Sequence, residues 1–261
     1  MRYTLFFSVI FALNGLYGMT QHVLFIAHRG ASFDAPENTL AAINLAWRQD
    51  ADAVEVDVHL SADHRIMVIH DEDTERTTGK KWVIKDTGSD QLRTLDAGIH
   101  NKGQYIGEHI PFLEEVLETI PPQKKLFIEI KSDQQIIPYL KDILMHHEKR
   151  SQLVFIGFDF EIMEIVKERM PDIPVYWLHF SVAGIYNLKH IERIRQAGLD
   201  GLNFHSRGLR EDYIVAAHEQ GLKIFAWTVD DPQEAQRLME AGIDGITSNR
   251  PKWLKNQVSN Q

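Results

Sequence analysis

Histidine, arginine and carboxylate side chains gather where consecutive apolar runs of this sequence end. His28 and Arg29 directly follow the first run. Glu55 and Asp57 alternate with valines in the second run, and His70 follows the third. Because successive side chains of a strand point to opposite faces, the two carboxylates point the same way. Paired carboxylates bind hard cations, an arginine fork binds phosphate, and histidines exchange protons, so these residues indicate a reactive site for a phosphate compound.

Alternating apolar and amphipathic stretches show which elements must position these residues. We expect strands at residues 23–27, 53–59, 66–69, 126–130, 153–156, 175–178, 201–204, 223–228 and 245–247. We expect helices at 35–47, with Pro36 in its first turn, and at 89–95, 112–119, 136–147, 160–170, 188–197, 211–220 and 232–241.

A repeated joint indicates how the strands are connected. QAGLDGL at 196–202 and EAGIDGI at 240–246 each end a helix with glycine and enter a buried strand, which is typical of parallel βα units. Without the short return strand at 66–69, about eight units remain, which predicts an α/β fold closed as a (β/α)8 TIM barrel. An open doubly wound sheet is disfavoured because no glycine-rich nucleotide loop follows the first strand.

The same residues belong to a longer series of motifs. The chain reads HRG, five further residues and PENT at 28–39, then EVD at 55–57 and HD at 70–71. Further motifs are ERTT at 75–78, LDAG at 95–98, IPFLEEVL at 110–117, IEIK at 128–131, AWTV at 226–229 and GIDGITSNRP at 242–251. In this order and spacing, the chain resembles the glycerophosphodiester phosphodiesterase family, as a short bacterial-type single-domain member, from about residue 23 to 252.

The resemblance implies a barrel at residues 20–255, with a small insertion at 72–109 that caps its mouth after the second strand. It also implies metal-dependent hydrolysis of glycerophosphodiesters, which are deacylated phospholipids, to sn-glycerol 3-phosphate and an alcohol. The attacking group is either a glycerol hydroxyl, giving a cyclic phosphate, or water. The chain departs from the family at 32–34 and at Ser248-Asn249, where many members have Thr-Asp, and this bears on substrate preference.

In barrels of this type the active site lies at the carboxyl ends of the strands. Glu55, Asp57 and Glu129 would offer oxygen ligands to one divalent cation, Ca²⁺ or Mg²⁺, and the family's metal ligands match these positions. Glu129 could instead form an ion pair with Lys131. The polar residues at expected strand ends are His28, Arg29, Glu55, Asp57, His70, Glu129, Lys131, Asn203, His205, Trp227 and Asn249.

The other roles follow from residue type. We expect His28 and His70 to be the general acid and base. We expect Arg29 and Lys131 to bind the substrate and neutralise its phosphodiester. Asp71 either orients His70 or caps the following turn.

Three alternatives remain open. A lysophospholipase D would need an apolar groove, for example from Trp82, Tyr105, Phe158 and Trp177, although the first two suit the core of the insertion better. Trp227 is expected to contact substrate or to pack at the barrel rim. A glycerophosphodiester-binding protein without turnover is disfavoured by the two histidines. A phosphoinositide lyase would stop at the cyclic phosphate.

The composition limits the partners. The chain has 261 residues and a formal net charge of −9, which argues against nucleic acid or an anionic membrane surface. It has no cysteine, so disulfides and cysteine-type zinc sites are excluded. We expect a small-molecule phosphodiester as substrate and no obligate membrane partner, and the sequence does not indicate the oligomeric state.

The two ends of the chain lie outside the expected barrel. Residues 5–17 form an apolar run whose length suits a signal peptide, which would make 1–19 a leader of an exported, periplasmic protein. Only one arginine precedes the run and no A-x-A site follows it. Met19 is the alternative start and would leave a cytoplasmic protein. We favour export, and we expect residues 256–261 to be a polar tail.

Overall fold

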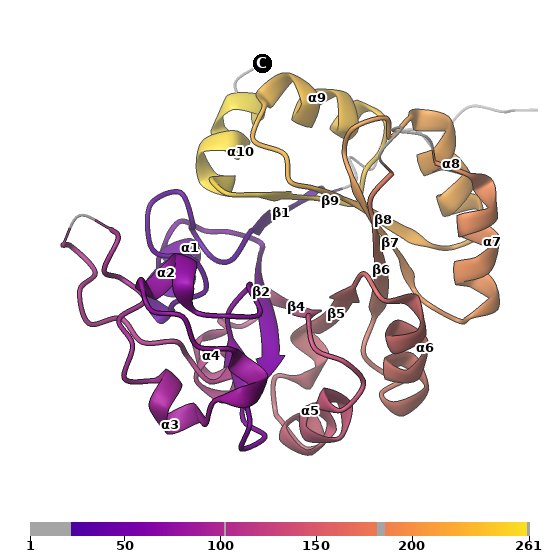
Figure 1. The fold of residues 1–261 in the computed structure, drawn as a ribbon. Coiled ribbons are helices and arrows are strands. Elements are labelled where there is room, and N and C mark those ends of the chain that lie inside the picture. The colour runs from indigo at the N-terminus through magenta and orange to yellow at the C-terminus, as the bar shows by residue number, and fades with distance from the viewer. Residues whose placement is uncertain (1–21, 102, 182–185, 260–261) are drawn as a thin grey trace, which may run out of the picture.

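Eight parallel strands form a closed ring in the computed structural model, which describes residues 22–101, 103–181 and 186–259. The ring runs β1-β2-β4-β5-β6-β7-β8-β9, and β9 pairs with β1 again, while helices cover its outside (Figure 1). The predicted (β/α)8 barrel is thereby confirmed, and the open sheet is excluded. The strands of the ring are β1 (Leu24–Ala27), β2 (Ala53–Leu60), β4 (Lys125–Ile130), β5 (Leu153–Gly157), β6 (Val175–His179), β7 (Gly201–His205), β8 (Lys223–Trp227) and β9 (Gly245–Ser248).

Eight helices among the described residues follow the strands of the ring, one for each strand. They are α1 (Leu40–Arg48), α4 (Leu113–Thr119), α5 (Ile136–Leu144), α6 (Phe160–Arg169), α7 (Leu188–Gln196), α8 (Glu211–Glu219), α9 (Pro232–Glu240) and α10 (Pro251–Ser259). Strand β3 (Ile66–Val68) returns antiparallel to β2. The short helices α2 (Glu75–Thr78), η1 (Ile84–Asp86) and α3 (Ser89–Leu92) lie in the segment after β3, and η2 (Arg150–Gln152) precedes β5.

The first helix begins later than expected. We predicted it at 35–47, but α1 starts at Leu40, after Pro36. Asn38 has a left-handed backbone, with φ 57°, and so interrupts any earlier helix. Thr39 caps the helix by accepting a hydrogen bond from Ala42 N at 3.2 Å.

The last helix was not predicted at all. The sequence pattern placed a polar tail at 256–261, but α10 continues through Ser259. It packs against α9 and β1, and its Leu254 and Val258 side chains are buried. The prediction was wrong because two buried side chains four residues apart among polar neighbours give only a weak helical pattern.

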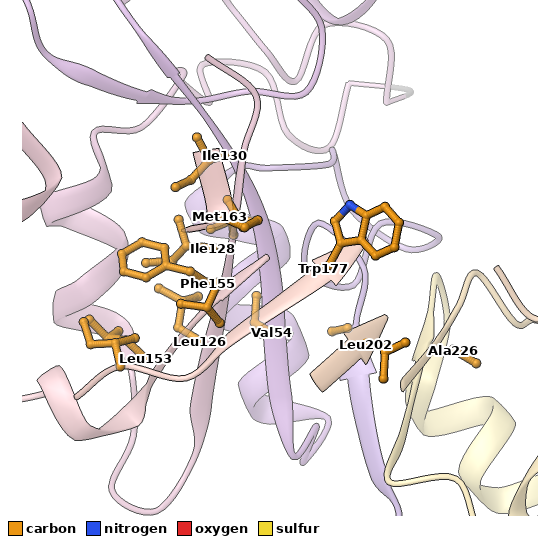
Figure 2. Packing of buried hydrophobic residues seen from close by; sticks show 14 of the residues in the cluster. Val54, Leu126, Ile128, Ile130, Leu153, Phe155, Met163, Trp177, Leu202 and Ala226 are labelled. Atoms are coloured by element: carbon orange, nitrogen blue, oxygen red, sulfur yellow. The ribbon is translucent and has the colours of Figure 1, made fainter. Parts of the chain in front are cut away.

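Two apolar layers line the two faces of the strands. On β4, Leu126, Ile128 and Ile130 pack in the outer layer, where helix side chains also lie (Figure 2). Phe127 points the other way, into a smaller inner layer. Glu129 shares the inward face of Phe127 because side chains two residues apart point the same way. The barrel interior therefore changes from apolar to acidic towards the carboxyl ends of the strands.

The segment 72–109 forms a small core of its own against β3. Ile84, Leu92 and Leu95 pack there with Met67 of β3, and Trp82 is partly buried against them. Trp82 therefore belongs to the core of the insertion, which is the role that the sequence favoured.

No helix among the described residues is long and apolar enough to cross a membrane. The apolar run at 5–17, on which the expected leader depends, lies outside the described residues.

Candidate active site

Most of the expected site residues line one cavity of about 170 Å³ at the carboxyl ends of the strands. Strand alternation brings them there, since inward-facing Ile26 precedes His28 and inward-facing Phe225 precedes Trp227, each by two residues. Asp57 is fully buried beside the acidic residues of the wall. The expected residues in the wall are His28, Arg29, Glu55, His70, Glu129, Lys131, Asn203 and Trp227.

Glu55, Asp57 and Glu129 form a buried acidic cluster. One carboxylate oxygen from each lies within 4.8 Å of the others. Glu55 Oε1 is buried without a hydrogen-bond partner, which is costly for a carboxylate unless a cation compensates it. Three carboxylates suit a hard divalent cation. The residues therefore fit the metal site that the sequence predicted.

Burial and mutual repulsion oppose ionisation of two of these carboxyls. Burial, followed by the charges of Asp57 and Glu129, raises the pKa of Glu55 well above its usual value. Burial, followed by Asp57, raises the pKa of Glu129 to about 7. Burial alone would also raise the pKa of Asp57, but Lys131 and Arg29 lower it. Protons and a divalent cation would thus compete for Glu55 and Glu129.

Two positively charged side chains, those of Lys131 and Arg29, form ion pairs with this acidic cluster. Lys131 Nζ lies 2.5 Å from Glu129 Oε1 and 3.3 Å from Asp57 Oδ1. Arg29 Nε lies 3.3 Å from Asp57 Oδ2, and the Arg29 backbone N–H donates to Glu55 Oε2 at 2.9 Å. The ion pair considered for Glu129 is therefore present, but within a larger charge network. Because both cations line the cavity, they can face a bound anion.

The loop that carries Arg29 has an unusual backbone. Arg29 and Gly30 have φ values of 57° and 81°. A Cβ added at Gly30 would lie 2.7 Å from the carbonyl carbon of Ala42, so glycine is required there. Asn38 closes the loop, since its N–H donates to Arg29 O at 2.9 Å and its Nδ2 donates to Asp57 Oδ2 at 2.8 Å. HRG and PENT are thus two sides of one loop that holds Arg29 against the acidic cluster.

A hydrogen-bond relay from the end of the barrel orients His28. His28 Nδ1 lies 2.7 Å from Asn249 Oδ1. Asn249 Nδ2 donates to Asp230 Oδ2 at 2.5 Å, so the amide oxygen faces His28 and the imidazole is protonated at Nδ1. Asp230 Oδ1 also accepts from Asn249 N at 2.9 Å and from Ser248 Oγ at 2.7 Å. Burial, followed by the charge of Arg29, lowers the pKa of His28 and favours its neutral form.

His70 is held by a carboxylate instead. Its Nδ1 lies 2.6 Å from Asp71 Oδ1, so Asp71 orients it, which is one of the two roles considered. Burial would raise the pKa of Asp71, but hydrogen bonds from Arg76 and His70 lower it to about 2. Asp71 is therefore ionised at neutral pH, and its charge favours the Nδ1–H form of His70.

Aromatic side chains follow the strands in the other half of the ring. Trp227 Nε1 donates to Asn203 O at 3.0 Å, which fixes the indole. Its ring is perpendicular to those of Phe158 and His205, with centroids 5.4 and 5.3 Å away. Phe180 lies 5.1 Å from His205 and is 47% exposed. Trp227 thus both packs at the rim and lines the cavity, together with Phe158.

The groove suggested from the sequence differs in composition. Trp177 cannot line it, because this side chain is buried in the outer layer (Figure 2), where it packs against Phe160 of α6. Neither Trp82 nor Tyr105 is in the cavity wall, and no other described residue of 72–109 is. Of the four residues suggested for this groove, Phe158 alone lines the cavity.

Four residues bind the site residues, or the residues that orient them, but were not singled out from the sequence. They are Glu37, Asn38, Arg76 and Asp230. Glu37 and Asn38 lie in PENT and Arg76 lies in ERTT, so the motifs marked these positions without indicating partners. Arg76 and Glu37 are 39 residues apart, and pairing over that distance has no local pattern. Asp230 follows AWTV, and its partner Asn249 was expected only as one of the polar residues at the strand ends.

Comparisons with known proteins agree with this geometry. The model of the glycerophosphoryl diester phosphodiesterase family matches residues 28–253. A glycerophosphodiester phosphodiesterase of Caldanaerobacter subterraneus is 34% identical over 241 residues, covering 90% of this chain and 97% of its own. A phosphodiesterase of Oleispira antarctica, solved with the product sn-glycerol-3-phosphate, superposes with a TM-score of 0.83 at 29% identity, covering 90% of this chain and 96% of its own. A Thermotoga maritima glycerophosphodiester phosphodiesterase superposes with a TM-score of 0.75 at 28% identity, over 90% of this chain and 98% of its own.

Proposed function

Because the chain belongs to the glycerophosphoryl diester phosphodiesterase family, we propose that it hydrolyses glycerophosphodiesters to sn-glycerol 3-phosphate and an alcohol with a divalent cation and two histidines. One observation carries the proposal. His28, His70, Arg29 and Lys131 line the same cavity as the buried acidic cluster. The sn-glycerol-3-phosphate in the Oleispira relative, which is the product expected here, supports the substrate class.

Each residue has a distinct part in the proposed reaction. Glu55, Asp57 and Glu129 would hold Mg²⁺ or Ca²⁺, which supplies positive charge to the phosphoryl oxygens when bound. Arg29 and Lys131 bind the negatively charged phosphodiester group of the substrate.

The two imidazoles carry the proton transfers. One accepts the proton of the attacking group, which is either water or a glycerol hydroxyl whose cyclic phosphate water then opens, and the other donates a proton to the oxygen of the leaving alcohol. His28 presents Nε2 to these steps because Asn249 occupies its Nδ1. His70 does the same because Asp71 occupies its Nδ1.

A lysophospholipase D is the second candidate. It is favoured by the exposed Phe158 and Phe180, which are 44% and 47% exposed at the mouth of the barrel and could contact one acyl chain. The two candidates share the residues of the acidic cluster and the histidines, and they differ only in the substrate.

The test is release of sn-glycerol 3-phosphate from glycerophosphocholine with EDTA, Mg²⁺ or Ca²⁺. We expect release only with a cation, and a rate lower by roughly 10²- to 10⁴-fold in His28→Ala and His70→Ala. His146→Ala is the matched control, because this histidine is exposed in the turn that follows α5.

Each other outcome has a defined meaning. Turnover of lysophosphatidylcholine without turnover of glycerophosphocholine would select the lysophospholipase. Binding without product from either substrate would overturn the enzymatic proposal, as would activity that EDTA and both histidine substitutions leave unchanged.

A further inference from the structure

The arginine of the ERTT motif, Arg76, binds one residue that contacts His70 and another that contacts Arg29. Arg76 lies in α2 of the insertion and does not line the cavity. All three of its guanidinium nitrogens donate hydrogen bonds. Nε donates to Asp71 Oδ2 at 2.6 Å, and Nη1 and Nη2 donate to the two oxygens of Glu37 at 2.8 and 2.7 Å. A fork that binds two carboxylates at once defines the position of both.

Each carboxylate bound by Arg76 also binds a residue of the cavity wall. Asp71 Oδ1 lies 2.6 Å from His70 Nδ1. Glu37 Oε1 accepts from Arg29 Nη1 at 2.9 Å. Arg76 is thus one residue removed from a proposed acid or base and from a proposed phosphate ligand.

The charges of this network depend on Arg76. Burial would raise the pKa of Glu37, but hydrogen bonds from Arg76, with the charge of Arg29, lower it. The two carboxylates in turn raise the pKa of Arg76. Without Arg76, Glu37 would have Arg29 as its main cationic partner, and it would compete more strongly with Asp57 for that guanidinium.

We propose that Arg76 is a positioning residue that orients His70 through Asp71 and Arg29 through Glu37, so that the insertion completes the active site. The proposal rests on the proposed function of the site. The two routes have separate signatures. Loss of the route through Asp71 slows proton transfer and lowers kcat, whereas loss of the route through Glu37 weakens phosphate binding and raises KM.

The first experiment measures kcat and KM for glycerophosphocholine in wild type, Arg76→Gln and Arg150→Gln. Arg150 is the matched control, because it also binds a carboxylate through two nitrogens, those of Asp172 at 2.6 and 2.7 Å, but lies away from the cavity. For Arg76→Gln we expect kcat to fall roughly tenfold to a hundredfold and KM to rise, as for other residues that orient site groups. Arg150→Gln should change neither constant.

Double substitutions separate the two routes. In an Asp71→Asn background, Arg76→Gln should still raise KM but lower kcat no further. In a Glu37→Gln background, it should still lower kcat but leave KM unchanged. Fully additive effects in both backgrounds would contradict the proposed routes.

Chemical rescue provides a test that does not depend on the stability of one variant. The Arg76 side chain is 47% exposed, so a small solute can enter the space that Arg76→Ala leaves. Millimolar guanidinium, far below denaturing concentrations, should restore part of kcat in Arg76→Ala and should not affect wild type or Arg150→Ala.

The outcomes also distinguish this proposal from the proposed function. An inactive wild type would overturn the function itself. An active wild type with unchanged kcat and KM in Arg76→Gln would overturn the role of Arg76 alone. An equal loss of kcat in Arg76→Gln and Arg150→Gln, without rescue by guanidinium, would show that Arg76 only forms a structural ion pair.

Discussion

At the residue scale, the two histidines differ in the group that holds Nδ1. An uncharged amide, that of Asn249, holds His28, whereas the carboxylate of Asp71 holds His70. His28 is also buried beside Arg29, which favours its neutral form. Two imidazoles in different electrostatic surroundings are what an acid and base pair requires.

The relay behind His28 can be tested at Asp230. Asp230→Ala removes the acceptor of Asn249 Nδ2, so the amide can turn and present its nitrogen to His28. We expect kcat to fall about tenfold to a hundredfold with KM little changed, in steady-state assays, since the substitution affects orientation rather than binding.

The neighbouring residue provides the control. Asp231 caps α9 by accepting from Gln233 N at 2.9 Å. Asp231→Ala should lower the free energy of unfolding by about 1 kcal/mol and leave kcat unchanged. Similar kcat values for the Asp230 and Asp231 variants would show that the relay has no catalytic role.

At the scale of elements, the strands bring residues to the cavity and the loops determine how they are oriented. The loop between β1 and α1 is the clearest case. It holds Arg29 through two consecutive residues of positive φ and through Asn38, which binds both Arg29 O and Asp57. Its backbone conformation is therefore part of the site.

Gly30→Ala tests this loop, and Gly221→Ala is a matched control. Gly221 has a φ of 74° but no atom within 4 Å of an added Cβ, so the control carries the backbone strain alone, about 1–2 kcal/mol. Gly30→Ala adds the overlap with Ala42, and we expect a larger loss of unfolding free energy in urea titrations, with a higher KM because Arg29 moves. Equal losses in both variants would mean that the loop accommodates the methyl group without moving.

Much of the arrangement of strands and helices could be predicted from the sequence, because it depends on local patterns. Strand periodicity and helix–glycine–strand joints are local patterns, so the barrel and the strand ends that carry Glu55, Asp57 and Glu129 were accessible. Hydrogen bonds such as those of Arg76 with Glu37 join distant segments, and no local pattern records them. Helix α10 was missed because few of its side chains are apolar.

At the scale of the whole molecule, the buried acidic cluster affects stability as well as chemistry. The pKa of Glu129 is about 7 in the folded protein, against an ordinary value of 4.5. Between these values the folded chain binds more protons than the unfolded chain at this group. The contribution of Glu129 to stability is therefore fully present below pH 4.5 and is lost as the pH rises through 7.

A divalent cation should replace the proton at this cluster. We expect Mg²⁺ or Ca²⁺ to raise the Tm of the EDTA-treated protein, and to raise it more at pH 8 than at pH 6, because fewer protons compete at pH 8. Differential scanning fluorimetry measures this, with Glu129→Gln to weaken the effect and exposed Glu118→Gln as the control. Equal shifts at both pH values, or an unaltered shift in Glu129→Gln, would contradict a cation at this cluster.

The pairing of β1 with β9 places His28 beside the end of the last strand of the barrel. The side chains of His28 and Asn249 are 221 residues apart in the sequence, whereas Glu55, Asp57 and Glu129 all come from its first half. During synthesis, the acidic residues therefore leave the ribosome long before the partner that orients His28. The growing chain therefore acquires its three site carboxylates first and the residue that orients His28 last, so the proposed reaction requires a closed ring.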